Sequence, residues 1–116
     1  MRRRLDKALL ARRLAEAAIR HALGLPYRLD TVPLSLREAA EEAVREAATG
    51  LVLVDEKGIL RCGLCGKGPF TRKGLYLHLR RVHLDAVSEH VERVFEERLW
   101  GSGSGGEPAT VEAEGR

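Results

Sequence analysis

The sequence predicts a mainly helical α+β fold. Residues 4–24 and 35–49 have apolar positions at helical spacing, and the same pattern returns between residues 71 and 99. A short apolar run with β-branched residues separates these stretches at residues 51–61. The length of 116 residues favours a single domain.

The first helix is predicted from residue 4 to residue 24. It is rich in alanine, leucine, arginine and glutamate, which favour helix formation. One side carries Leu10, Leu14, Ala17, Ala18 and His21. Gly24 and Pro26 end the helix, because glycine suits the C-cap and proline cannot continue the hydrogen-bonding pattern.

The second helix is predicted to begin at Ser35. Glu38 follows three residues later, which is the spacing of a capping box. The apolar stripe of this helix consists of Leu36, Ala39, Ala40, Ala43, Val44 and Ala47. Gly50 ends the helix, and the small alanine side chains allow a partner helix to approach closely.

Residues 51–61 are predicted to form a β-hairpin. Residues 51–54 and 59–61 are the two strands, and residues 55–58 end in glycine and supply the turn. Beyond the last helical pattern, residues 101–106 are glycine and serine only, which is typical of a flexible segment. The acidic residues 107–116 favour a disordered tail.

Composition excludes several classes of protein. No apolar run reaches the roughly 18 residues of a membrane-spanning helix, so we expect no membrane partner. Charged residues interrupt the N-terminal stretch where a signal peptide would be apolar. With two cysteines, a secreted disulfide scaffold is excluded. We therefore expect a cytoplasmic protein, with association with the nucleoid or the ribosome left open.

The chain contains no asparagine or glutamine, and its only methionine is Met1. Its basic residues are 16 arginines and 4 lysines. A low content of thermolabile side chains together with a high content of charged ones is typical of proteins from hot environments. A thermophilic, archaeal-like source is therefore the expectation, although a GC-rich genome produces part of the same bias.

One motif carries metal chemistry. Two cysteines two residues apart are followed by two histidines, in the order Cys62-x2-Cys65-x12-His78-x4-His83. A cysteine pair on a β-turn can offer two thiolates to one ion, and two histidines on neighbouring helical turns can complete a tetrahedron. We predict one structural Zn²⁺ with these four ligands.

The motif resembles the C2H2 zinc-finger family. The shared residues are Cys62, Cys65, Gly66, Lys67, Phe70, Leu75, His78 and His83. The resemblance covers residues 59–83 and implies a ββα unit around the metal. In the family the aromatic residue usually follows the second cysteine by four positions, whereas Pro69 moves Phe70 to the fifth.

With the finger at residues 59–83, the chain divides into four segments. Residues 1–58 form a helical region that includes the start of the hairpin. The finger helix is expected to continue into a C-terminal helix at residues 84–100, and residues 101–116 form the tail. The N-terminal helices are expected to pack against this long helix.

Other interpretations of the cysteines and histidines stay open. A redox dithiol at Cys62 and Cys65 would require a helix starting at the first cysteine in a thioredoxin-like setting, which the sequence does not show. A chance arrangement of buried cysteines and histidines is the other alternative. His21 and His90 lack partners at ligand spacing and are interpreted as ordinary helix residues.

The sequence does not predict an enzyme. Four protein ligands leave no open position on the metal, and we find no nucleophile–base pair and no phosphate-binding glycine loop. No small-molecule substrate is therefore expected.

The finger helix lacks the side chains that read bases. Standard fingers read the major groove from helix positions −1, 3 and 6, which are Thr71, Gly74 and Leu77 here. Glycine has no side chain, and leucine cannot hydrogen-bond to a base edge. On a continuous helix, Lys73, Tyr76 and Leu77 would share a face with the later apolar stripe, so we expect this face to pack on the N-terminal helices or on a partner.

The formal net charge of +3 conceals alternating blocks. Residues 1–28 and 61–83 each carry +6, whereas residues 29–60 carry −4 and residues 84–116 carry −5. Arginine forms bidentate contacts with phosphate, so these blocks favour nucleic-acid binding, to RNA or DNA, through backbone or shape contacts. A solvated charged surface is the simpler alternative. The candidate contact residues are Arg2, Arg3, Arg4, Arg12, Arg13, Arg20, Lys67, Arg72, Lys73, Arg80 and Arg81.

A protein-interaction module is the alternative function. Its contact surface would be the acidic segments or the apolar stripe of the C-terminal helix. That stripe consists of Leu84, Val87, Val91, Val94 and Phe95. Docking on a larger complex and homodimerisation through this stripe are the two variants of this hypothesis.

Overall fold

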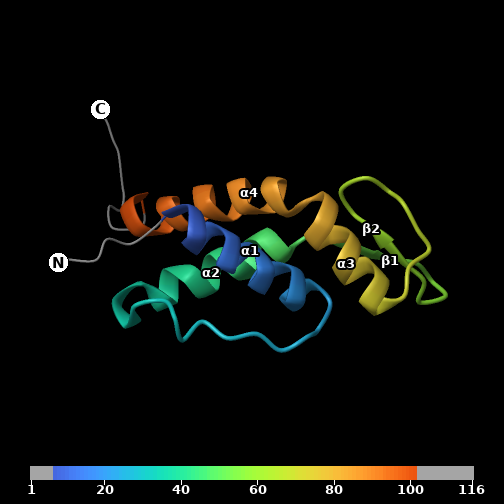
Figure 1. Cartoon of the computed structure of the whole chain (residues 1–116), viewed down its shortest axis with the longest axis horizontal. Helices are drawn as coiled ribbons and strands as arrows, with labels where there is room; N and C mark the ends of the chain where they lie inside the picture. Colours follow the sequence, from blue (N-terminus) through green and yellow to red (C-terminus); the bar gives the residue numbers. More distant parts are fainter. Residues whose placement is uncertain (1–6, 102–116) are drawn as a thin grey trace.

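The computed structural model describes residues 7–101, in which four α-helices and a two-stranded sheet follow one another (Figure 1). The elements are α1 (Lys7–Ala22), α2 (Arg37–Ala48), β1 (Val52–Val54), β2 (Leu60–Cys62), α3 (Arg72–Val82) and α4 (Leu84–Glu96). The fold is mainly helical with a small antiparallel sheet, as predicted. The first three residues of the predicted N-terminal helix and all but Gly101 of the predicted tail lie outside the described residues.

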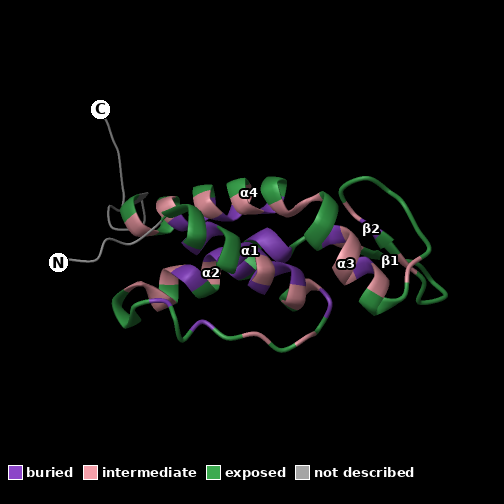
Figure 2. Ribbon diagram, viewed as in Figure 1, coloured by how far each residue is buried: buried purple, intermediate pink, exposed green. Residues whose placement is uncertain are grey.

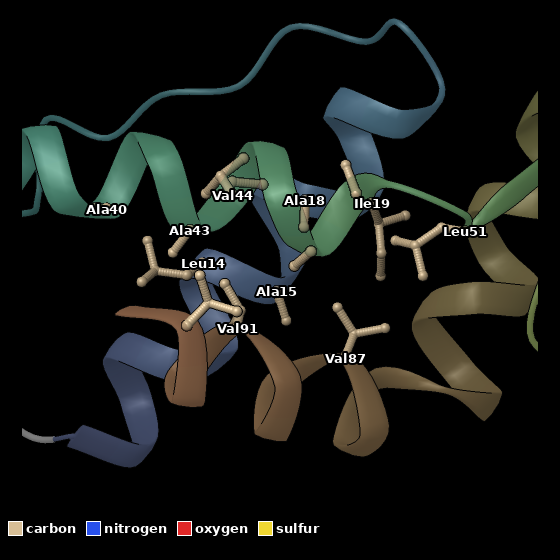
Figure 3. Close-up of a cluster of buried hydrophobic side chains, with 14 of the residues drawn as sticks. Leu14, Ala15, Ala18, Ile19, Ala40, Ala43, Val44, Leu51, Val87 and Val91 are labelled. Carbon is tan, nitrogen blue, oxygen red and sulfur yellow. The ribbon is translucent and has the colours of Figure 1, made fainter. Parts of the chain in front are cut away.

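Helices α1, α2 and α4 form a bundle with a continuous apolar core (Figure 2). Leu14 and Ile19 on α1, Val44 on α2 and Val91 on α4 are fully buried. Figure 3 shows small side chains of α1 and α2 interleaved with these larger ones. Ala40, Ala43 and Ala47 of the predicted alanine stripe of α2 are buried in this core.

The sheet and α3 lie together at one end of the bundle (Figure 1). Strands β1 and β2 pair antiparallel in the register Val52↔Cys62, Leu53↔Arg61 and Val54↔Leu60. The predicted turn is confirmed, because Asp55 Oδ1 accepts hydrogen bonds from the backbone N–H groups of Lys57 and Ile59. The hairpin leads directly into the cysteine pair.

The predicted capping box at Ser35 is wrong. Residues Leu34–Leu36 form a single 3₁₀ turn, and α2 begins at Arg37 with no side-chain cap. The Arg37 N–H donates to Leu34 O, and the Arg37 guanidinium donates to Val32 O at 2.8 Å. The 3₁₀ turn after Pro33 thus takes over the role that a serine cap would have played.

The predicted continuous helix over residues 71–99 is also wrong. It breaks at His83, where φ is −116° and ψ is 10°, so α3 and α4 are separate helices. The His83 N–H still donates to Leu79 O at 3.0 Å, and the His83 carbonyl accepts from the Val87 N–H at 3.0 Å. A π-helical turn, Glu97–Gly101, follows α4.

The apolar stripe of α4 is covered by the chain itself. Val87, Val91, Val94 and Phe95 are all buried, and α4 packs on both α1 and α2. Leu84 is half-buried against the same core. The surface that the sequence offered for homodimerisation therefore belongs to the intramolecular core.

Candidate metal centre

Four side chains, from the end of β2 to the residue after α3, converge at the bundle end that carries the sheet. Cys62 ends β2, Cys65 lies in the turn after it, His78 lies on α3 and His83 directly follows α3. One ligand atom from each residue lies within 4.8 Å of all the others. The four predicted ligands thus form a Cys2His2-type group that can hold one metal ion.

A tight turn brings the two thiols together. The Cys62 N–H donates to Lys67 O, and the Gly66 N–H donates to Cys62 O, both at 2.8 Å. Gly66 has φ of +79°, which a residue with a side chain adopts only with strain. The Leu64 N–H also donates to Cys62 Sγ at 3.4 Å, a contact that stabilises a metal-bound thiolate.

Helix α3 is placed so that both histidines face the cysteines. Thr71 caps its N-terminus by accepting a hydrogen bond from the Gly74 N–H at 3.0 Å, as expected for a threonine N-cap. Leu75 and Leu79 are fully buried and fix the rotation of the helix. His78, three residues after Leu75, brings its Nε2 within 3.3 Å of Cys65 Sγ.

Phe70 packs against the ligand group despite its shifted position in the sequence. Its N–H donates to Leu60 O at 2.9 Å, which adds an isolated bridge beside β2. The ring stacks on the His78 imidazole with centroids 4.8 Å apart. Phe70 therefore supports the orientation of a candidate ligand.

His83 carries an unsatisfied buried nitrogen. Its Nε2 is buried and has no hydrogen-bond partner among the described residues. Burial, followed by the nearby charges of His78 and Lys67, holds the pKa of the His83 imidazole below its ordinary value. The neutral ring, which is the form that ligates metals, is favoured, and a bound ion would satisfy the free nitrogen.

The donor set fits zinc. Bond lengths of roughly 2.3 Å to sulfur and 2.0–2.1 Å to nitrogen place the ligand atoms of a tetrahedral site roughly 3.3–3.8 Å apart. The observed spread of up to 4.8 Å requires only small side-chain adjustments to reach these separations. Two thiols and two imidazoles with no open position describe a site that holds structure together rather than one that activates water.

The structure distributes the candidate phosphate-contact residues over several places. Arg2, Arg3 and Arg4 lie outside the described residues. Two other candidates form ion pairs with Glu16: Arg20 Nε lies 2.8 Å and Arg80 Nε 2.7 Å from its carboxylate. Arg12 lies 3.6 Å from Asp85. The remaining candidates are exposed and form no ion pair among residues 7–101: Arg13, Lys67, Arg72, Lys73 and Arg81.

Tyr76 joins α3 to the bundle. Its hydroxyl donates to Glu16 and also accepts a hydrogen bond from Arg20 Nη2 at 3.2 Å. This confirms in part that the face of α3 containing Tyr76 packs on the N-terminal helices, although Lys73 stays exposed. Sequence reasoning missed Glu16, because a single acidic residue in a basic segment gives no sign of its distant partners.

Sequence reasoning also missed Arg28. It lies in the connection between α1 and α2 and lines the same surface groove as Arg12, Arg13 and Arg80. The charge of residues 1–28 was the available signal, but a connection lacks the periodicity that would show which way a side chain points.

Comparisons with protein families, with curated proteins and with solved structures find no match for this chain. No helix within residues 7–101 combines the length and the apolar character needed to cross a bilayer. The class that fold and site define is a small helical protein with a Cys2His2-type group able to hold one metal ion.

Proposed function

We propose that Cys62, Cys65, His78 and His83 bind one structural Zn²⁺ and that the metal-stapled protein binds nucleic acid through phosphate contacts. The observation that carries the metal assignment is the convergence of four ligand atoms from distant parts of the chain, one of them a buried nitrogen without a partner. Such a nitrogen costs free energy unless something binds it.

The metal would connect the sheet to α3. Cys62 and Cys65 belong to the hairpin end, whereas His78 and His83 belong to α3 and its junction with α4. Leu75 and Leu79 are the fully buried residues of α3, so the apolar core on this helix is small. Zinc contributes about 10–16 kcal/mol to the folding of isolated finger peptides, so it can supply what this small core lacks.

Native mass spectrometry of protein purified without added metal tests this assignment. We expect one zinc ion per chain, and tetrahedral d–d absorption after replacement by Co²⁺. The matched control is His21→Ala, which removes a histidine outside the group and leaves the metal content at one. Full zinc content in Cys65→Ala would contradict the assignment.

The nucleic-acid part of the proposal is supported by unneutralised positive charge. Residues 61–83 contain six basic and no acidic side chains. Five of the six are exposed without an ion-pair partner in the described chain: Arg61, Lys67, Arg72, Lys73 and Arg81. Thr71, Gly74 and Leu77 at the reading positions favour backbone contacts over base readout.

Fluorescence anisotropy with labelled RNA and DNA of mixed sequence, measured over a range of salt concentrations, tests nucleic-acid binding. Because phosphate contacts release counterions, affinity should fall steeply as salt rises and should vary little between sequences. No binding at low salt, or a dissociation constant independent of salt, would overturn this part of the proposal while leaving the metal assignment intact.

A protein-interaction module is the second candidate, and exposed apolar residues on the hairpin favour it. Leu53 is 49% exposed, Val54 60% and Ile59 36%. The stripe of α4 no longer serves this hypothesis, because α1 and α2 cover it. Co-purification from source cells with and without nuclease separates the two candidates, since only contacts through nucleic acid are lost on digestion.

A further inference from the structure

Two adjoining surface grooves lie along α1. The first is bounded by α1, the connection that follows it, the last turn of α3 and the start of α4, and the second by α1 and the same connection. One has a volume of about 500 Å³ and the other about 480 Å³, both within the roughly 300–1,000 Å³ of ligand sites. They share Arg13, Glu16 and Arg28. Five arginines and two carboxylates line them in total: Arg12, Arg13, Arg20, Arg28, Arg80, Glu16 and Asp30.

Three of the arginines are available to a ligand. Arg13 forms no ion pair within residues 7–101. Arg12 lies 3.6 Å from Asp85, and Arg28 lies 3.9 Å from Asp30, with every side chain in these two pairs more than half exposed. Exposed ion pairs of this length contribute little, so a phosphate can replace either carboxylate at little cost.

Glu16 does not compete for these arginines. Tyr76 and Arg20 bind one of its oxygens, and Arg80 binds the other. Its charge is therefore balanced by Arg20 and Arg80. An anion that enters the grooves meets Arg13, which has no ion pair in the described chain, and Arg12 and Arg28, whose ion pairs are long and exposed.

The walls of the grooves are partly apolar. Leu9, which is 48% exposed, and Leu84 line the first groove, and Pro26 and Tyr27 line the second. A duplex keeps the faces of its bases stacked inside and offers its backbone and the edges of its bases to such walls. An unpaired strand offers phosphates to arginines and bases to apolar side chains or guanidinium planes.

We propose that these grooves form a binding site for an unpaired nucleic-acid strand, with phosphates on Arg12, Arg13 and Arg28 and at least one base against the apolar walls. This inference rests on the proposed nucleic-acid binding. It places the principal contacts on α1 and the connection that follows it, and none of Thr71, Gly74 and Leu77 lines either groove.

Charge reversal tests the site. The double variant Arg13→Glu/Arg28→Glu is compared with Lys57→Glu/Arg93→Glu, which makes the same change of charge at exposed positions outside the grooves. The probes are single strands of about a dozen nucleotides, as RNA and as DNA, and the same sequence as a duplex. Circular dichroism and zinc content establish that each variant is folded.

We expect the groove variant to weaken single-strand binding by about tenfold or more, equivalent to about 1.4 kcal/mol or more. The slope of log affinity against log salt should fall by about one for each lost contact. The control variant should change affinity by less than about threefold, which is less than 1 kcal/mol. Wild-type protein should prefer the single strand to the duplex.

The outcomes separate the two proposals. Wild-type binding that the groove variant leaves unchanged, or that the control weakens equally, overturns the site but not the function. Equal affinity for strand and duplex overturns the assignment to an unpaired strand. Failure of the wild-type protein to bind any probe overturns the proposed function and this inference together.

Discussion

The Tyr76 hydroxyl on α3 donates a hydrogen bond of 2.5 Å to Glu16 Oε2 on α1, across 60 positions of sequence. Arg20 and Arg80 bind the same carboxylate from α1 and α3. The Arg20 guanidinium also lies 5.2 Å from the centre of the Tyr76 ring. This polar cluster fixes α3 against the bundle.

Replacing Tyr76 with phenylalanine removes one hydrogen bond to a carboxylate and keeps the ring. Hydrogen bonds to charged groups contribute about 1.5–3 kcal/mol, and the partial exposure of this pair places it at or below the lower end. We expect Tyr76→Phe to lower the free energy of unfolding by about 1 kcal/mol. Urea unfolding followed by circular dichroism measures it, and Tyr27→Phe, which loses an exposed hydrogen bond to His21, is the control.

Stability should also depend on the ionisation of Glu16. Burial alone would raise the pKa of this carboxyl, but hydrogen bonds from Tyr76 and Arg20 and the charges of Arg80 and Arg20 lower it overall. A carboxyl with a lowered pKa in the folded state stabilises the protein above its unfolded pKa of about 4.3, and this contribution is lost as pH falls through the folded pKa.

Glu16→Gln should therefore be less stable than wild type at neutral pH, with a difference that shrinks as pH falls below about 4.3. Urea titrations at a series of pH values in excess zinc measure this difference. Glu56→Gln, in the exposed hairpin turn, should differ little from wild type throughout. A Glu16→Gln difference that stays constant over the acid range would contradict the expectation.

Removal of one ligand tests the role of the metal in folding. Cys65→Ala leaves three ligands, so we expect loss of the bound ion and a large drop in Tm, because zinc contributes on the order of 10 kcal/mol in finger peptides. Calorimetry with and without a chelator checks this result. A chelator should lower the Tm of wild type towards that of Cys65→Ala and should leave the variant unchanged.

Gly63 in the cysteine turn packs closely against the backbone that follows α2. A Cβ added there would lie 1.8 Å from Gly50 O, and the Gly63 N–H donates to Leu51 O at 2.9 Å. Gly63→Ala must push two backbone segments apart, so we expect a loss of about 3 kcal/mol, the upper end for overpacking. Gly74→Ala is the comparison. At that position alanine gains about 1 kcal/mol in helix propensity, which opposes the cost of a tight contact between the new Cβ and Thr71.

Local signals predicted most of the elements. The hairpin turn follows from Asp55, whose side chain bonds to the next residues, and from Gly58, which adopts a φ of +82°. Thr71 caps α3, and Gly24 and Gly50 follow the ends of α1 and α2 with positive φ. The spacing of the four candidate ligands is likewise local information, and it identified the group that the fold brings together.

What failed could not be predicted from residue type and spacing alone. Ser35 carries the residue type of a cap, but the 3₁₀ turn before Arg37 removed the need for one. Arg20 and Arg80 count as free charges in the sequence, whereas Glu16 binds both in the folded chain. Periodicity could not reveal the break at His83, because the residues on both sides of it favour helix.

The break at His83 ties the candidate metal centre to the bundle. This one residue offers a candidate metal ligand, donates its N–H to the last turn of α3 and accepts the Val87 N–H in the first turn of α4. A single inserted residue after His83 would rotate α4 by about 100° and turn Val87 and Val91 away from α1 and α2. The sheet and α3 with the candidate ligands therefore cannot be moved to another protein on their own. A tandem array or a domain swap of them would have to include α4.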